Sequence, residues 1–102
     1  MKTYKDFLLV SDLDGTLLNS EKIVSTANKV AINEFVARGG QFAIATGRTP
    51  DNARGYLRGI TVNSPSIFYN GSLLVDLPSG KILKSCPLNG ILWRQFAAYC
   101  LK

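Results

Sequence analysis

Apolar residues in this chain fall into short blocks that are separated by polar and glycine-containing segments. The blocks Phe-Leu-Leu-Val at 7–10 and Phe-Ala-Ile-Ala at 42–45 are continuously apolar, without the alternation of a half-exposed strand. Such runs are typical of strands that are covered on both faces in a parallel sheet. A shorter block at 67–69 predicts a third strand. We therefore expect the first two strands to be buried on both faces.

Segments in which apolar residues recur at helical spacing separate these blocks. Apolar residues at 30, 31, 35 and 36 recur at the interval of a helix, which Ser25 can cap and Gly39 can end in a left-handed conformation. Pro50 can open a second helix that runs to about residue 58. The order strand, helix, strand, helix, strand predicts an α/β fold with a Rossmann-like parallel sheet and right-handed crossovers.

The pattern changes after residue 71. Segments 72–76 and 81–85 predict two strands of a β-hairpin around the turn Leu-Pro-Ser-Gly at 77–80. From Asn89, a candidate N-cap, apolar residues at helical spacing predict a final helix. That helix has no C-terminal capping signal, so we interpret the chain as stopping within an element.

Composition narrows the chemistry. The chain has 102 residues, 46% hydrophobic and 19% charged, which is ordinary for one globular domain. The sequence contains no histidine, which excludes serine-histidine triads and most zinc sites and leaves oxygen ligands suited to magnesium or calcium. Cys86 and Cys100 form no CxxC pair, so we expect both to be reduced and structural.

Charge and hydropathy exclude further classes. The net charge is +5, but its cations are scattered, and the nearest cluster is Arg48, Arg54 and Arg58. A nucleic-acid site needs a basic stripe with interleaved aromatic residues, so no nucleic-acid partner is predicted. No apolar run approaches a membrane span, and the apolar stretch near the start is too short for a signal peptide. We expect a cytoplasmic protein.

Polar residues follow each of the three predicted strands. They are Ser-Asp-Leu-Asp-Gly-Thr at 11–16, Thr-Gly-Arg at 46–48 and Asn-Gly at 70–71. Ligands of open parallel sheets bind beyond the carboxyl ends of the strands, so these segments can converge on one site. Strand ends also commonly lead into polar loops that have no function.

Asp12 and Asp14 strengthen the functional interpretation. Two carboxylates at the end of a buried strand repel each other, and this repulsion is costly near a low-dielectric core. A divalent cation relieves it, and hard oxygen ligands suit Mg²⁺. The alternatives are an Asp- and Gly-rich turn or a calcium loop. A calcium loop needs acidic ligands at alternate positions, which Leu18 and Ser20 do not supply.

The run Asp-Leu-Asp-Gly-Thr-Leu-Leu at 12–18 resembles the first motif of the haloacid dehalogenase superfamily of phosphohydrolases. The run at 43–48 resembles the second motif of that superfamily. With Ile-Phe-Tyr-Asn-Gly-Ser at 67–72, the pattern is similar to the Cof-type branch, whose larger cap domain is inserted after the third strand. The resemblance implies that 1–85 is the N-terminal part of an incomplete catalytic core and that 86–102 begins a truncated α/β cap.

The resemblance also implies roles for single residues. Asp12 would attack phosphorus and form an aspartyl-phosphate. Asp14 would protonate the leaving oxygen and then activate water. An aspartate at position 14 favours a phosphatase over the P-type ATPases of the superfamily, which carry a lysine there.

Other positions would bind the phosphoryl group or the metal. The Thr46 hydroxyl and the backbone N–H groups of Leu13 and Gly47 would donate hydrogen bonds to the phosphoryl group. The Asp12 carboxylate and the Asp14 carbonyl would hold Mg²⁺. For Arg48 and Asn70 two roles stay open, contact with substrate or anchoring of loops and cap.

Two motifs of the superfamily are absent from this sequence. The third, a lysine, and the fourth, an acidic pair, lie beyond the cap, and after Asn70 the only acidic residue here is Asp76. Phosphoryl transfer depends on positioning and charge neutralisation, so we expect weak Mg²⁺ binding and negligible turnover from this chain. The sheet should also lack strands that cover its edge, which favours self-association.

Several functions remain in view. The first is a Mg²⁺-dependent phosphatase of a small phosphorylated metabolite such as a sugar phosphate. A phosphomutase of the same superfamily is the second. A non-catalytic module, a truncated gene product that binds a partner through the exposed sheet edge and the apolar last helix, is the third. A receiver domain also clusters aspartates but lacks the Asp-Gly-Thr turn.

Overall fold

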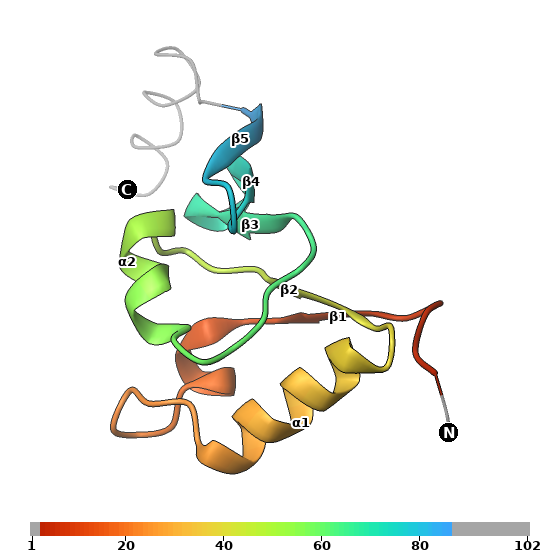
Figure 1. The fold of residues 1–102 in the computed structure, drawn as a ribbon. Helices are drawn as coiled ribbons and strands as arrows, with labels where there is room; N and C mark the ends of the chain where they lie inside the picture. The colour runs from red at the N-terminus through yellow and green to blue at the C-terminus, as the bar shows by residue number, and fades with distance from the viewer. Residues whose placement is uncertain (1–2, 87–102) are drawn as a thin grey trace, which may run out of the picture.

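The computed structural model describes residues 3–86, so the helix predicted after Asn89, residues 87–102 of the cap segment and Cys100 lie outside the described part. The elements in chain order are β1 (Leu8–Ser11), the single π-type turn η1 (Leu13–Leu17), α1 (Thr26–Ala37), β2 (Gln41–Ile44), α2 (Pro50–Tyr56), β3 (Ser66–Phe68), the 3₁₀ turn η2 (Tyr69–Gly71), β4 (Leu73–Asp76) and β5 (Lys81–Ser85). The predicted mixed α/β order and the β4–β5 hairpin are confirmed (Figure 1).

The strands form two hydrogen-bonded sheets that meet at a single bridge. β1 pairs in parallel with β2, from Leu8 opposite Gln41 to Ser11 opposite Ile44. β3, β4 and β5 form an antiparallel sheet in that order. One parallel bridge, between Ala45 and Ile67, connects the two sheets just after β2. In Figure 1 the strands therefore follow one another from β1 to β5 across the molecule.

Side chains complete the hydrogen bonding of β2 where strand pairing does not. The Phe42 N–H donates to Asn63 Oδ1 at 2.8 Å, and the Ile44 N–H donates to Ser66 Oγ at 3.0 Å. Asn63 Nδ2 in turn donates to the Gly40 carbonyl at 3.1 Å. Buried backbone groups need such partners. The segment before β3 therefore lies against β2 through these side chains and through the N–H groups of Asn63 and Ser64, which donate to the Phe42 carbonyl, each at 3.2 Å. Strand pairing with β3 is limited to the one bridge, between Ala45 and Ile67.

Both helices begin at a side-chain cap; the sequence analysis predicts the cap at Ser25 and the opening of α2 at Pro50, but not the cap at Thr49. Ser25 Oγ accepts from the Asn28 N–H at 3.2 Å, and Thr49 Oγ1 accepts from the Asn52 N–H at 3.1 Å, with Pro50 at the first helical turn of α2. Gly39 follows α1 with a φ of 96°, the left-handed conformation expected there.

The core lies where β2, β3 and β4 pack with η1. Phe42, Ile44, Phe68, Leu13 and Val75 are each at most 1% exposed. The helices contribute Ile32 from α1 and Ala53 from α2 to the same cluster. The apolar stripe predicted for α1 is partly wrong, because Val30 is 60% exposed and Ile32 is the buried residue.

The expectation that residues 7–10 are covered on both faces is wrong for the described part of the chain. Phe7, Leu8, Leu9 and Val10 are 46–63% exposed. Their strand, β1, pairs with β2 on one side only within residues 3–86. A continuous apolar run indicates that a strand favours burial, but the segments that cover the strand must come from elsewhere in the fold.

Two further observations complete the description. Cys86 is free and exposed, so it is not packed as the structural cysteine that we expected. Within residues 3–86, no helix has the length and apolar character needed to cross a membrane.

Gly40 provides a test of packing between α1 and β2. A Cβ at this position would lie 2.4 Å from the Phe35 ring, so we predict that Gly40→Ala destabilises the fold by about 1–3 kcal/mol. Gly55→Ala is the matched control, since a Cβ there meets nothing within 4 Å and alanine favours the helix by about 0.5–1 kcal/mol. Urea unfolding measures both, and equal stability of Gly40→Ala and the parent chain would contradict this packing.

Candidate active site

The first motif folds into one tight turn that separates its apolar and acidic side chains. Asp12 caps the turn by accepting a hydrogen bond from the Leu13 N–H at 2.7 Å. The Leu18 N–H closes it on the Leu13 carbonyl at 2.9 Å, and Gly15 takes a φ of 74°. Leu13 is fully buried, whereas Asp12 is exposed and Asp14 is half-buried. The buried leucine thereby presents the flanking carboxylates at the end of β1.

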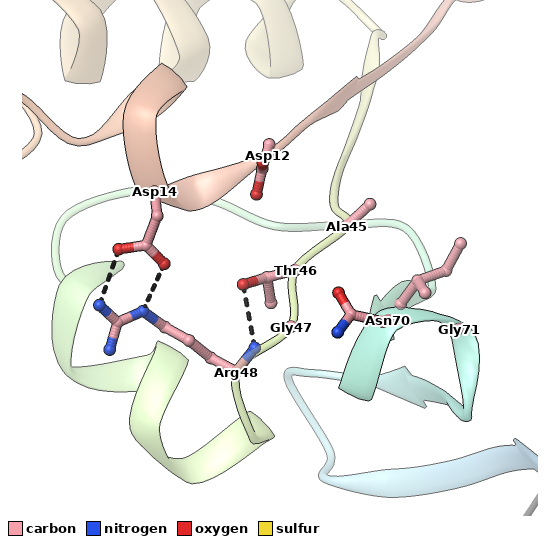
Figure 2. Close-up of a pocket in the computed structure, with 9 residues that line it drawn as sticks. Asp12, Asp14, Ala45, Thr46, Gly47, Arg48, Asn70 and Gly71 are labelled. Carbon is pink, nitrogen blue, oxygen red and sulfur yellow. Dashed lines mark hydrogen bonds and ion pairs between the residues drawn. The ribbon is translucent and has the colours of Figure 1, made fainter. Parts of the chain in front are cut away.

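The three strand ends converge on one pocket of about 430 Å³. Figure 2 shows Asp12 facing the Thr46 hydroxyl, with Asp14 turned toward Arg48 and Asn70 beside Gly47. Its lining residues come from all three predicted segments: Asp12, Asp14, Ala45, Thr46, Gly47, Arg48, Ile67, Asn70 and Gly71. All of the residues that the sequence analysis proposes for the site line this pocket except Leu13.

The Leu13 side chain packs in the core, and its N–H donates to the carboxylate of Asp12. In this arrangement that N–H is not directed at a ligand. Its binding to a phosphoryl group would require this hydrogen bond to break.

Thr46 is held rigidly in the pocket wall. It is 5% exposed, its N–H donates to the Ile67 carbonyl at 2.9 Å, and its carbonyl accepts from the Asn70 N–H at 3.2 Å. Its Oγ1 accepts from the Arg48 N–H at 3.2 Å. A hydroxyl that accepts one hydrogen bond still has its own hydrogen to donate. Thr46 can therefore donate to an oxygen atom of a bound ligand.

Gly47 permits the close approach of Asn70. A Cβ at position 47 would lie 2.9 Å from Asn70 Oδ1, a separation that packed atoms do not tolerate. Asn70 itself adopts a left-handed conformation with φ 53° and ψ 37°, which asparagine tolerates better than most residues. The absence of a Cβ at Gly47 and the left-handed backbone of Asn70 together bring the Asn70 amide into the pocket.

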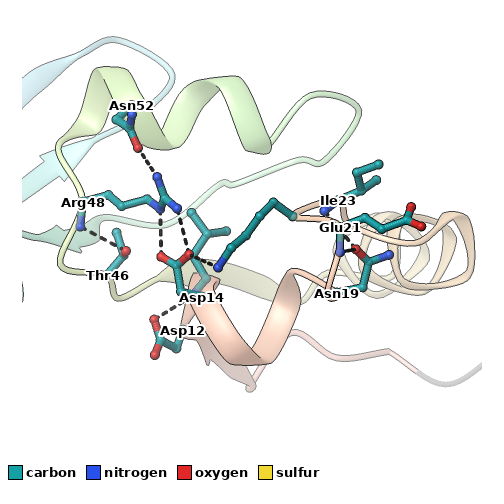
Figure 3. Close-up of polar contacts among 10 residues, drawn as sticks. Asp12, Asp14, Asn19, Glu21, Ile23, Thr46, Arg48 and Asn52 are labelled. Carbon is teal, nitrogen blue, oxygen red and sulfur yellow. Dashed lines mark hydrogen bonds and ion pairs between the residues drawn. The ribbon is translucent and has the colours of Figure 1, made fainter.

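Arg48 forms a two-pronged ion pair with Asp14. Its Nε and Nη2 donate to the two carboxylate oxygens of Asp14, each at 2.8 Å (Figure 3). A further nitrogen, Nη1, donates to Asn52 Oδ1, and the guanidinium lies over the Tyr56 ring at 4.4 Å from its centroid. Arg48 is thus anchored to helix α2 as well as to η1.

A second cation reaches the same carboxylate. Lys22 Nζ lies 3.2 Å from Asp14 Oδ1. The hydrogen bonds from Arg48 are the main cause that lowers the pKa of Asp14 to about 2, with Lys22 adding to the effect. The same pairing raises the pKa of the Arg48 guanidinium above its usual range. Asp14 is therefore ionised at neutral pH in this arrangement.

The sequence analysis missed three residues of this network. Asn52 and Tyr56 are four residues apart, so helical spacing alone could have placed them on one face of α2, which begins two residues after Arg48. Lys22 carries no comparable signal, because its position depends on a loop that folds back toward Asp14.

The donors present fit a magnesium ion only in part. The Asp12 carboxylate and the Asp14 main-chain carbonyl are hard oxygen ligands of the kind that Mg²⁺ accepts together with water and phosphate oxygens. The Asp14 carboxylate is occupied by two cations. Within residues 3–86 no group of three or more acidic, histidine or cysteine side chains gathers around one point. These residues can supply part of a magnesium site, with Asp12 as its one available carboxylate.

Comparison with known proteins identifies the family of this chain. The family described as haloacid dehalogenase-like hydrolase matches residues 9–102, and the chain belongs to this family. The 5-amino-6-(5-phospho-D-ribitylamino)uracil phosphatase YcsE of Bacillus subtilis is 39% identical over 69 residues, which make up 68% of this chain and 28% of that protein.

Two solved structures share the fold. BT1666, a phosphatase of the same superfamily from Bacteroides thetaiotaomicron, superposes with a TM-score of 0.79 at 24% identity over 93% of this chain and 35% of that one. A HAD/COF-like hydrolase from Plasmodium vivax has a TM-score of 0.68 at 25% identity over 96% and 36%. The chain thus spans about a third of the length of these proteins.

The Asp14–Arg48 pair yields a pH prediction. Because the pKa of Asp14 is lower in the folded chain than its ordinary value of 3.8, this pair stabilises the fold above about pH 4. That contribution is lost as the pH falls through about 2. In Arg48→Met the pKa of Asp14 should rise toward 3.8, as carboxyl ¹³C NMR titration would measure. The exposed Arg58→Met serves as control, and an unchanged Asp14 pKa in Arg48→Met would contradict the assignment.

Proposed function

We propose that this chain is the N-terminal part of a Mg²⁺-dependent phosphatase that acts through an aspartyl-phosphate on Asp12. The observation that carries the proposal is the convergence of Asp12, Asp14 and Thr46 on one pocket at the carboxyl ends of the strands. Family membership and relatives named as phosphatases support the same reaction class. Residues 86–102 would begin the cap that covers this pocket.

In the first step an Asp12 carboxylate oxygen attacks the phosphorus, and the bond from phosphorus to the leaving oxygen breaks. Asp14 gives a proton to that oxygen. In the second step water attacks the aspartyl-phosphate, Asp14 takes a proton from the water, and the phosphorus–Asp12 bond breaks to release phosphate. The Thr46 hydroxyl and the Gly47 N–H hold the phosphoryl oxygens in both steps.

The ion pair between Asp14 and Arg48 bears directly on this cycle. An Asp14 with a pKa of about 2 is ionised at neutral pH and is a weak base, so it carries no proton in this arrangement. A phosphate ester beside Asp14 adds negative charge, which disfavours the carboxylate and raises its pKa. The substrate therefore raises the pKa of Asp14, which Arg48 lowers, and so favours the protonated Asp14 that the first step needs.

Magnesium, when bound to the Asp12 carboxylate and the Asp14 carbonyl, would neutralise charge on the phosphoryl oxygens. Arg48 holds the Asp14 side chain, whereas the Asp12 carboxylate stays available to attack the phosphorus. We assign Arg48 to the positioning of Asp14, because three of its nitrogens and its ring-facing surface are engaged by protein groups.

The substrate class follows from the relatives and from the pocket. The Bacillus subtilis relative is named for a phosphorylated ribityl compound. A pocket lined by one hydroxyl, one amide, one guanidinium and two carboxylates is suited to a small phosphorylated metabolite such as a sugar phosphate. The apolar, half-exposed edge of β1 would add a tendency of the 102-residue chain to self-associate.

Replacement of Asp12 tests the reaction. In the complete product of the gene, Asp12→Asn should reduce phosphate release in Mg²⁺ by about 1,000-fold or more, since it removes the nucleophile. Release of inorganic phosphate from p-nitrophenyl phosphate measures this, with the exposed Asp6→Asn as control. Full activity of Asp12→Asn would contradict the mechanism, and a transferred phosphoryl group without free phosphate would indicate a mutase.

Replacement of Thr46 tests phosphoryl binding separately. Thr46→Val keeps the shape and loses the donor, so kcat should fall about 100-fold with a smaller change in KM. Thr46→Ser keeps the hydroxyl and should retain most of the activity. Steady-state kinetics of the two variants decide the question, and equal rates would remove Thr46 from the proposed site.

A further inference from the structure

We propose that Lys22 is a specificity-determining residue that binds an anionic group on the leaving-group portion of the phosphate ester, such as a carboxylate next to the ester carbon. The inference rests on the proposed function, because it takes the leaving oxygen to lie beside Asp14. Lys22 is outside the motifs that carry the family resemblance.

The loop that presents Lys22 is tightly organised by Asn19. The side-chain oxygen of Asn19 accepts from the Glu21 N–H at 2.9 Å and from the Ile23 N–H at 3.1 Å (Figure 3). Its backbone pairs with Lys22 and Ile23, each at 2.9 Å. These hydrogen bonds fix the conformation of the loop at residues 19–23.

Lys22 adopts a strained conformation in this loop. Its φ is 62°, a left-handed value that costs energy for a side chain other than glycine and that is seen where the surrounding structure enforces it. A turn alone would accept glycine or asparagine at this position. The conformation directs the lysine toward Asp14, eight residues back in the chain, where its Nζ lies 3.2 Å from Oδ1.

The two cations at Asp14 differ in how firmly they are held. Arg48 is 23% exposed and is bound by Asp14, Asn52 and the Tyr56 ring. Lys22 is 56% exposed, and its ammonium group has Asp14 as its one hydrogen-bond partner within residues 3–86. Exposed single-contact ion pairs of lysine contribute little, so the ammonium group is the cation that a ligand can recruit.

The position of Lys22 selects which part of a ligand it meets. Lys22 is not among the residues that line the pocket of Asp12 and Thr46, where the phosphoryl group would bind. It lies beside Asp14, which faces the leaving oxygen in the proposed reaction. A negative group of the ligand close to that oxygen is therefore within reach of the Lys22 ammonium group. Arg48 is already paired with Asp14, so it does not balance the charge of this group.

The test measures the binding of two phosphate esters, which differ in one substituent, to the 102-residue chain. In 2-phospholactate a carboxylate stands where isopropyl phosphate has a methyl group. We expect 2-phospholactate to bind about fivefold more tightly, the typical scale of one exposed charge pair, as measured by ¹H–¹⁵N NMR titration. Lys22→Met should abolish this preference without changing the affinity for inorganic phosphate, while Lys22→Arg should retain it.

Two controls separate charge from loop structure. Lys84→Met removes an exposed lysine of β5 and should leave the preference intact. Lys22→Gly removes the charge but relaxes the left-handed backbone, so the preference should vanish while the thermal stability is unchanged or higher.

The outcomes also distinguish the two proposals. If inorganic phosphate shifts the amides of Thr46, Gly47 and Asn70 but both esters bind Lys22→Met and the parent chain in the same ratio, the role of Lys22 is overturned and the proposed function stands. If neither inorganic phosphate nor either ester shifts these amides in the parent chain, the role of Lys22 is overturned, whereas full activity of Asp12→Asn in the complete product of the gene overturns the proposed function.

Discussion

The parallel pairing of β1 with β2 is the constraint on which the site depends. In this register Ser11 lies opposite Ile44, so the residues that follow the two strands, Asp12 and Ala45, lie at the same edge of the sheet. The bridge from Ala45 to Ile67 adds the end of β3 to that edge. Because parallel strands share a direction, polar loops that are far apart in sequence meet without any further organising element.

Charge balance is the second consequence of this convergence. Asp12 and Asp14 are presented by one turn, and two cations, Arg48 from the loop after β2 and Lys22 from the loop after η1, both pair with Asp14. Arg48 also joins η1 to α2 through Asn52 and Tyr56, so the position of the Asp14 carboxylate is tied to a helix of the core. The site is thus built from an electrostatic network as much as from strand ends.

Backbone strain is concentrated in the loops around the pocket. Lys22, Tyr69 and Asn70 are the residues other than glycine with positive φ within residues 3–86, and Asn70 lines the pocket. Strained conformations of this kind persist where surrounding contacts enforce them, and they often occur at functional sites. Here Asn19 fixes the loop of Lys22, and Thr46 and Arg48 accept the N–H groups of Asn70 and Tyr69.

The sequence by itself determined the order of the elements, the cap at Ser25, the opening of α2 at Pro50, and the three polar segments that form the pocket, because these depend on local preferences and on short apolar runs. It did not predict the exposure of β1 or the pairing of Arg48 and Lys22 with Asp14. Burial of a strand depends on layers that other segments supply, and an ion pair depends on which side chains the fold brings within a few ångströms. Only the tertiary structure decides such distances, since residues 14, 22 and 48 are separated along the chain and meet through the register of the sheet and the course of its loops.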